Sequence, residues 1–255
     1  MPQELSQQKL SQKDWLLALP VVGRIALSKA PLWTLALIGL MVAQIIIPET
    51  RDYALIALLA NLAFSICTAT VMCIVANGYR DYLQKQEPKP QTEVLARAPI
   101  ALVTSYLYWV VVTLGSILLL IPGLILAVRG CLAFAVVCLE HRNPIAGFDE
   151  SSRLTSGRFW QVVRYLAVPV FLCLFFYFAD PIIIQLLDVA MAEENAVAGG
   201  SWKQNVAAAA LLTFIGCLCM TLVMCITALQ VRLYMQFKAG EEKTIKTDEP
   251  SPNAK

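Results

Sequence analysis

The chain has 255 residues, of which 58% are apolar and only 15% are charged, and its mean hydropathy is +0.64. These values exclude an ordinary soluble domain, because such domains are about 45–50% apolar and about 25% charged. The formal net charge of +2 gives no reason to expect a nucleic-acid partner, and the basic residues are expected to face anionic lipid headgroups instead. The composition therefore predicts an integral membrane protein.

Six stretches of the chain are apolar enough to cross a bilayer. A transmembrane helix needs about 20 apolar residues, because the hydrocarbon core of a bilayer is about 30 Å thick. In chain order the stretches are 32–47, 53–77, 100–121, 123–139, 159–187 and 205–237. This pattern predicts an all-α integral membrane protein with six transmembrane helices and short interfacial helices on the cytoplasmic side.

The third and fourth stretches follow each other almost without a polar residue. As one helix, residues 100–139 would be about 60 Å long, which is about twice the thickness of the hydrocarbon core. The chain must therefore reverse its direction, and Pro122 with Gly123 is the expected place. Proline lacks an amide donor, and glycine accepts the backbone angles of a tight turn.

Seventeen of the 20 Lys and Arg residues fall on one side of the predicted membrane. The exceptions are Arg51 and Lys203 in the opposite loops and Arg129 inside the fourth stretch. Because basic residues are enriched in cytoplasmic loops, this asymmetry predicts that both termini are cytoplasmic. The chain is expected to cross the membrane several times, with the basic loops on the cytoplasmic side.

The polar ends divide the chain into three parts. Residues 1–30 are expected to be a cytoplasmic segment, in which the apolar residues after Asp14 share one face of an interfacial helix that Pro20 kinks. Residues 31–238 form the six-helix transmembrane domain. Residues 239–255 are rich in charge and proline and have no aromatic residue, so we expect a disordered cytoplasmic tail.

The sequence offers little for catalysis or metal binding. All eight cysteines fall inside the predicted spans without the two-residue spacing of a metal-binding knuckle, so we expect them to pack as small hydrophobic side chains. His141 is the only histidine, which argues against a Ser-His-Asp triad and excludes histidine-rich zinc chemistry. The acidic residues near it are better explained as a solvated loop than as the site of a lipid-modifying enzyme. We therefore expect no cofactor, no metal and no enzymatic activity.

A short helix is predicted at residues 144–156, between the fourth and fifth stretches. Asn143 suits its N-cap, and Gly157 can end it. The segment is too polar to span a membrane. We expect it to lie flat at the cytoplasmic interface, with Arg153 and Arg158 near lipid phosphates.

The region around this helix resembles the signature of a bacterial membrane-protein superfamily. The run IPGLILAVRGCLAFAVVCLE, followed by HRNPIAGFDESSRLTSGRFWQV, is similar to the YciC-like inner-membrane proteins and to the membrane domain attached to some glycerophosphodiester phosphodiesterases. The matching residues are Pro122, Gly123, Arg129, Glu140, Pro144, Ser151, Leu154, Thr155, Gly157, Arg158 and Trp160. The pattern favours Ala where this chain has Gly147 and Trp where it has Ser152. The resemblance implies a multi-pass inner-membrane protein without a firm activity, because no residues remain here to build the phosphodiesterase barrel.

A few polar residues lie inside the predicted spans. Arg129 and Asp180 each fall about 10 Å below the outer surface, so they can meet. An unpaired charge at such depth costs about 3 kcal/mol or more, which favours direct pairing or access to water. Gln44, Asn61 and Gln185 are expected in the same outer half of the membrane. These five residues form the candidate intramembrane polar cluster.

Two functions fit this pattern. A dry polar cluster would hold the helices together by interhelical hydrogen bonds, as in a non-enzymatic scaffold or accessory protein for lipid or envelope processes. A water-filled cavity near Arg129 and Asp180 would indicate a transporter or channel for a small solute or a lipid. We favour the scaffold because one Arg and one Asp can satisfy each other. Membrane lipids are the expected partners, and other membrane proteins or a second copy remain open alternatives.

Overall fold

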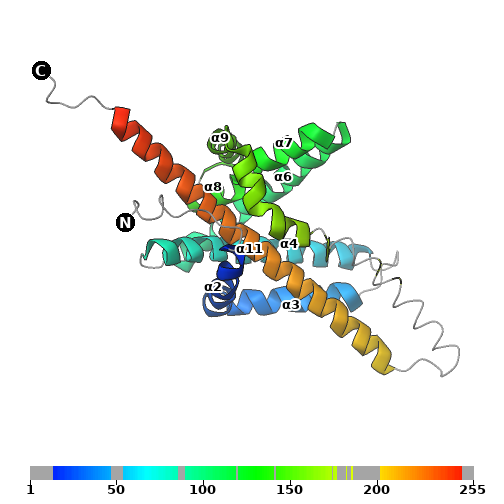
Figure 1. Ribbon diagram of the computed structural model, residues 1–255. Coiled ribbons are helices and arrows are strands. Elements are labelled where there is room, and N and C mark those ends of the chain that lie inside the picture. The colour runs from blue at the N-terminus through cyan, green and yellow to red at the C-terminus, as the bar shows by residue number, and fades with distance from the viewer. Residues whose placement is uncertain are drawn as a thin grey trace, which may run out of the picture.

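The computed structural model describes residues 14–46, 54–85, 90–118, 120–140, 142–173, 175–176, 182, 185 and 202–248. Every regular element within these residues is a helix, as predicted (Figure 1). The labelled helices are α2 (Asp14–Lys29), α3 (Pro31–Ile46), α4 (Ala54–Gln84), α5 (Gln91–Leu95), α6 (Ala98–Leu118), α7 (Leu120–Gly130), α8 (Ala133–Glu140), α9 (Pro144–Thr155) and α11 (Trp202–Asp248). A further apolar helix covers Phe159–Cys173.

Several of these helices are long and apolar enough to cross a membrane. The candidate spans are Leu58–Gln84, Gln91–Ile117, Ile121–Glu140 and Thr213–Glu241. Helices α2 and α3 together could provide another, although they bend by 100° where they meet. The all-helical fold with membrane-length helices is therefore confirmed, and the described residues supply four or five spans where the sequence predicts six. The predicted stretch 159–187 is a continuous apolar helix only over Phe159–Cys173 in the described residues.

The hairpin of α6 and α7 is present, but its turn lies earlier than predicted. Helix α6 ends at Leu118 and α7 begins at Leu120, so Pro122 stands in the first turn of α7, where a missing amide donor is tolerated. Gly123 faces α6 instead of forming the turn. A Cβ atom on Gly123 would lie only 2.6 Å from the backbone nitrogen of Ser116, so this glycine permits the two helices to pack closely.

Helix α2 covers the predicted N-terminal helical segment, but the apolar residues that were predicted to share one face do not all lie on its buried side. It buries Val22 and Ile25 and exposes Leu17 and Leu27. Proline at the first position of a helix has a suitable backbone angle, and α3 begins with Pro31 directly after the bend. The buried face of α2 packs against α4 and α11, so this segment forms part of the fold.

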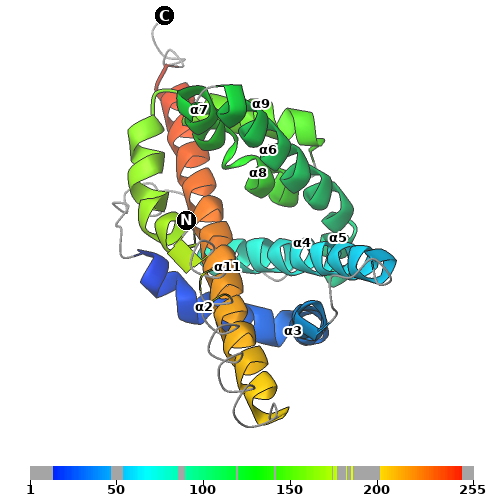
Figure 2. The same cartoon turned by 90° about the vertical axis from the view of Figure 1, so that its right-hand side faces the viewer.

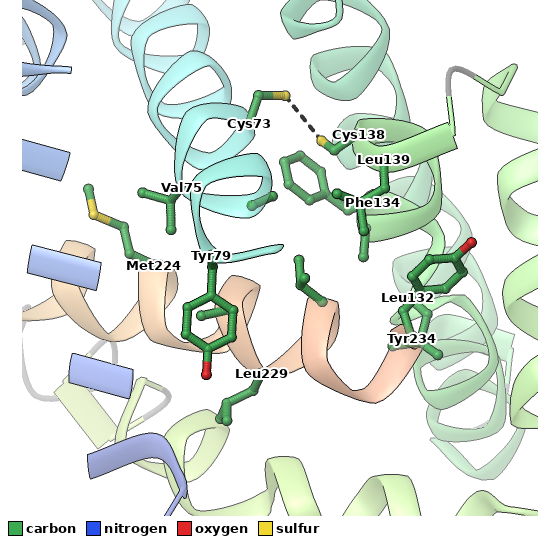
Figure 3. Packing of buried hydrophobic residues seen from close by; sticks show 14 of the residues in the cluster. Cys73, Val75, Tyr79, Leu132, Phe134, Cys138, Leu139, Met224, Leu229 and Tyr234 are labelled. Carbon is green, nitrogen blue, oxygen red and sulfur yellow. Dashed lines mark hydrogen bonds between the residues drawn. The ribbon is translucent and has the colours of Figure 1, made fainter. Parts of the chain in front are cut away.

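The core of the molecule surrounds α8. This helix is apolar on all sides, and its residues 133–139 are all buried, as expected for a helix that is hydrophobic all round. Helix α11 crosses α4 on its way through the molecule (Figures 1 and 2). Figure 3 shows core side chains from these three helices and the turn before α8: Val75, Tyr79, Leu132, Phe134, Leu139, Met224, Leu229 and Tyr234.

The long helices are packed at one end and exposed at the other. Residues 73–81 of α4 are all buried, whereas Leu55, Leu58 and Leu62 near its beginning are exposed. Trp109 of α6 is exposed as well. Apolar surface of this extent suits contact with lipid hydrocarbon. We call the two regions the packed end and the lipid-facing end.

Helix α11 extends further than the sequence predicts. It has 47 residues, which corresponds to about 70 Å and exceeds the thickness of the hydrocarbon core. The predicted disordered tail began at residue 239, but residues 239–248 are helical, and residues 249–255 lie outside the described residues. Near the start of this extension, Glu241 pairs with Arg153 of α9 at 2.9 Å, so the extension contacts α9.

Candidate functional site

Arg97 is a buried cation at the packed end. It lies between α5 and α6, and only 2% of its surface is exposed. Its Nη1 donates to the carbonyl oxygens of Cys138 at 2.5 Å and Leu139 at 3.4 Å, and to Oδ1 of Asn77 at 3.4 Å. Its Nη2 pairs with Oε1 of Glu93 at 2.5 Å. We call Arg97, Asn77, Glu93 and Cys138 the arginine cluster.

The arginine cluster closes the C-terminal end of α8. The last carbonyl groups of a helix have no partner within that helix, and they form the negative end of its dipole. Arg97 donates to two of them, and Nδ2 of Asn77 reaches the carbonyl of Cys138 at 3.3 Å. The sequence analysis treated Arg97 as one of the solvated basic flanks and missed this role. The signal that could have identified it is its position directly beside the apolar beginning of α6.

Two cysteines meet beside the arginine cluster. Sγ of Cys73 on α4 lies 3.1 Å from Sγ of Cys138 on α8, and both residues are fully buried (Figure 3). Nδ2 of Asn77 also donates to the carbonyl oxygen of Cys73 at 3.0 Å. The sequence analysis expected separate small hydrophobic side chains. It gave no signal for this contact, because the two cysteines are 65 residues apart in the chain.

A second group of polar residues joins the ends of α8 and α11. Oε1 of Glu140 accepts hydrogen bonds from the hydroxyl of Tyr234 and from Nζ of Lys238. Its Oε2 forms an ion pair with Nε of Arg142 at 2.9 Å, and Arg142 lies 3.8 Å from Glu150 of α9. Hydrogen bonds to ionised groups are about twice as strong as those between neutral groups. Glu140 therefore connects α8 with both α9 and α11.

The ion pairs continue from α9 to α11. Arg153 pairs with Glu150 at 2.8 Å and with Glu241 at 2.9 Å. The hydrogen bond from Arg153 lowers the pKa of Glu150, and the two carboxylates raise the pKa of Arg153. We call Glu140, Glu150, Arg153, Lys238 and Glu241 the helix clamp. It fixes the long helix α11 to the packed end of the molecule.

A small pocket opens between α2, α4 and α5. Its polar lining includes Lys29, Asp81 and Gln91. Asp81 lies 3.7 Å from Lys29 and 2.6 Å from Arg80, and Gln91 donates to the carbonyl oxygen of Lys29 at 2.9 Å. The charged side chains of this pocket thus pair with one another and join the three helices.

Only part of the predicted intramembrane polar cluster lies within the described residues. Asp180 and the side chain of Gln44 lie outside the described residues. Asn61, Arg129 and Gln185 are each exposed. The direct pairing of Arg129 with Asp180 therefore stays a prediction.

Arg129 lies closer to α9 than the sequence predicts. Its carbonyl oxygen accepts a hydrogen bond from Oγ of Ser151 at 2.5 Å, and the same Oγ accepts one from the backbone N–H of Leu132 at 3.1 Å. Ser151 thus bridges the break between α7 and α8. Gly147 packs on α8 so tightly that a Cβ atom there would lie 2.7 Å from Cγ2 of Val137. Helix α9 therefore runs back along α8 to the level of Arg129, whereas the sequence placed the two at different depths.

The other signature residues shape α9 itself. The predicted helix is present and begins at Pro144, although the side chain of Asn143 makes no capping hydrogen bond. Leu154 and Thr155 are buried, and they hold the helix against the core. Gly157 has a φ angle of 75°, a region that favours glycine, and it follows the end of the helix as predicted.

The basic residues near α9 are engaged by protein groups. Arg153 belongs to the helix clamp, and the guanidinium of Arg158 lies 4.7 Å from the ring centroid of Phe237 in α11. Such cation–π contacts are worth about 0.5–1 kcal/mol at exposed sites. Trp160 is 75% exposed, as suits an aromatic residue at a membrane interface. The contact of the arginines with lipid phosphates stays a prediction.

Comparison of the chain with protein-family models, with curated proteins and with solved structures gives no match. The resemblance to the YciC-like proteins is therefore a hypothesis from the signature residues alone. Within the described ranges, no three His, Cys, Asp or Glu side chains come together in a way that could hold a metal ion. The arrangement that the structure shows is one in which charged and polar groups join helices.

Proposed function

We propose that this chain is a non-enzymatic scaffold or accessory protein of the bacterial inner membrane, acting in a lipid or envelope process. The observation that carries this proposal is the use of its charged residues. The arginine cluster closes the end of α8, and the helix clamp ties α11 to α8 and α9. These charged groups bind one another and helix carbonyls. Their role is therefore to stabilise the arrangement of helices that forms the surface of the packed end.

The proposal includes six transmembrane helices with both termini in the cytoplasm. The exposed apolar side chains of the lipid-facing end support a membrane location. Arg80, Arg97, Arg142 and Arg153 all lie at the packed end, which supports a cytoplasmic position for that end. The packed end would then present α9 and the end of α11 to a partner in the cytoplasm.

Membership of the YciC-like family is part of the same proposal. Glu140, Ser151 and Gly157 of the signature hold or end helices in this fold. These roles support the interpretation that the signature residues stabilise the fold and do not catalyse a reaction. Membrane lipids and a protein bound at the packed end are the proposed partners.

A transporter or channel is the second candidate. It rests on Arg129, which is exposed on α7, a helix whose other residues are apolar or small. An exposed arginine within a membrane span is costly unless water or an acidic group is near. This function requires that the region around Arg129 opens to water.

Photo-crosslinking in membranes can distinguish the two functions. A photoreactive amino acid is placed at Asp149 or Tyr82, both exposed at the packed end, and at Leu124 on the lipid-facing end as a matched control. A scaffold should give discrete protein adducts at the first two positions and lipid adducts at Leu124. Two findings together would contradict the scaffold and favour a transporter. The first is the absence of protein adducts at the packed end, and the second is solute flux in proteoliposomes that Arg129→Leu abolishes.

A further inference from the structure

The contact between Cys73 and Cys138 is the strongest unexplained feature of the core. Their sulfur atoms are 3.1 Å apart, which is shorter than the sum of two sulfur radii and about 1 Å longer than a disulfide bond. The two residues come from different helices, so a bond between them would fasten α4 to α8 (Figure 3).

The backbone on both sides of this pair is held in place. Nδ2 of Asn77 donates to the carbonyl oxygens of Cys73 and Cys138, at 3.0 and 3.3 Å. Arg97 also donates to the carbonyl oxygen of Cys138. One asparagine thus bridges the same two residues whose sulfur atoms meet. The proximity of the thiols is therefore built into the packing of the helices.

We propose that Cys73 and Cys138 form a reversible disulfide that locks α4 to α8 under oxidising conditions. This inference does not depend on the scaffold function. A small neutral peroxide is a suitable oxidant, because both sulfur atoms are buried and a bulky reagent would have to separate the helices. A dithiol reductant reverses the reaction by thiol–disulfide exchange.

The reaction balances in two steps. One thiol loses its proton and, as thiolate, attacks an oxygen of hydrogen peroxide; the O–O bond breaks, a sulfenic acid forms, and the leaving hydroxide takes up that proton to become water. The second thiol attacks the sulfenic sulfur, the S–O bond breaks, and a second water leaves. Two thiols and one peroxide give one disulfide and two waters, and the sulfur atoms lose the two electrons that the peroxide gains.

Mass spectrometry of the oxidised protein tests the proposal directly. The full-length chain in native membranes is treated with hydrogen peroxide, quenched with acid, denatured and alkylated. We expect two fewer alkylated cysteines, a single crosslinked peptide pair that contains Cys73 and Cys138, and recovery of both thiols after dithiothreitol. Retention of both thiols, or their conversion to sulfinic acid without a crosslink, would overturn the proposal.

Matched variants show whether the bond is specific to this pair. Cys73→Ser and Cys138→Ser should each abolish the crosslink, whereas Cys67→Ser on the same helix α4 and Cys131→Ser in the same span should keep it. The measurement on the wild-type chain decides the question even where a serine variant fails to fold. A crosslink that instead joins Cys73 or Cys138 to another cysteine would contradict the assigned pair.

Discussion

At the scale of single residues, Arg97 is a buried cation that joins α5, α4 and α8 at the packed end. It donates hydrogen bonds to terminal carbonyl oxygens of α8 that would otherwise need water as a partner, and its side chain is almost completely buried. Removal of one partner from a buried charged contact costs about 3 to 5 kcal/mol, because the remaining groups are left without compensation. Arg97→Met keeps much of the volume and removes the charge, so it isolates this effect.

We expect Arg97→Met to lower the thermal midpoint of unfolding in detergent and the yield of folded protein. Arg142→Met is the matched control, because Arg142 is 43% exposed at its side chain and its ion pairs are worth about 1 kcal/mol or less. Thermal unfolding of the purified variants measures both effects. Equal midpoints for the two variants would show that Arg97 does not close α8.

Ser151 gives a second prediction at this scale. Its hydroxyl bridges the carbonyl oxygen of Arg129 and the amide of Leu132, where α7 and α8 are interrupted. Ser151→Ala leaves buried backbone groups unsatisfied, at a cost of about 1–3 kcal/mol. Ser152→Ala, one residue further along α9, should be nearly neutral because its side chain is only partly buried. Thermal unfolding of the pair provides the test, and an equal loss in both variants would refute the bridge.

The residues that sequence analysis missed share one physical property. Arg97 and Cys138 act through partners that are distant in the chain, and the separation of Arg97 from the carbonyl of Cys138 is 41 residues. Hydropathy reports how a residue partitions into a membrane, but it contains no information on which helix lies beside it. Ser151 is different, since it belongs to the signature, yet its contact with Arg129 required the three-dimensional path of α9.

At the scale of elements, the approximate positions of the long helices followed from the sequence, while their ends, breaks and contacts did not. Most of the stretch 100–121 forms α6, which ends at Leu118, and residues 54–77 lie within α4, because long apolar runs favour buried or membrane helices. The interruption after Gly130 was not predicted, because it lies inside the predicted stretch 123–139, in which Arg129 is the only charged residue. Its stabilisation by a serine from α9 is a tertiary effect.

The α6–α7 hairpin gives a prediction for one glycine. A Cβ atom on Gly123 would lie 2.6 Å from the nitrogen and 2.7 Å from the Cα of Ser116, and backbone atoms cannot move aside as a side chain can. Gly123→Ala should therefore destabilise the protein by about 1–3 kcal/mol through overpacking. Gly39→Ala is the control, because the space around Gly39 in α3 is open and alanine is about 1 kcal/mol better than glycine in a helix. The close approach of α7 to α6 at Gly123 would be contradicted if the unfolding midpoint falls for Gly39→Ala and not for Gly123→Ala.

The helix clamp should respond to acid. The folded state lowers the pKa of Glu150 from its ordinary value of 4.5, so its ion pair is fully present above pH 4.5 and is lost as the pH falls through the lowered pKa. Acidification below pH 4.5 should then loosen the end of α11. The effect is modest, because Arg153 is 57% exposed and exposed ion pairs are worth about 1 kcal/mol or less.

Hydrogen exchange measures this loosening in lipid nanodiscs. Amides near Glu241 should lose protection below pH 4.5, after correction for the intrinsic pH dependence of exchange. Glu150→Gln removes the titrating group and should show a smaller change when the pH is lowered from 6 to a value below the lowered pKa of Glu150. A pH response that is identical in wild type and variant would assign it to a different carboxylate.

At the scale of the whole molecule, the structure distinguishes the packed end from the lipid-facing end. The sequence predicted only the order of the helices along the chain. The lipid-facing end is apolar and open, and the packed end contains the arginine cluster and the helix clamp. The bias of basic residues in the sequence predicts that one set of loops is cytoplasmic, and the packed end lies at that set. Two independent properties, charge bias and side-chain packing, therefore distinguish the same end of the molecule.

The number of crossings is the last prediction, and loop reporters can decide it. Six spans require that fusions after Lys255 and near Arg142 report the cytoplasm, while insertions at Glu49 and at residues 196–201 report the opposite side. The bend of 100° between α2 and α3 matters here, because a re-entrant pair would return Glu49 to the cytoplasmic side. Likewise, if the helix that begins at Phe159 does not cross, then residues 196–201 stay on the side of Arg142. Each reporter thus tests the crossings between it and the preceding reporter, and agreement between Arg142 and residues 196–201 would remove the fifth span.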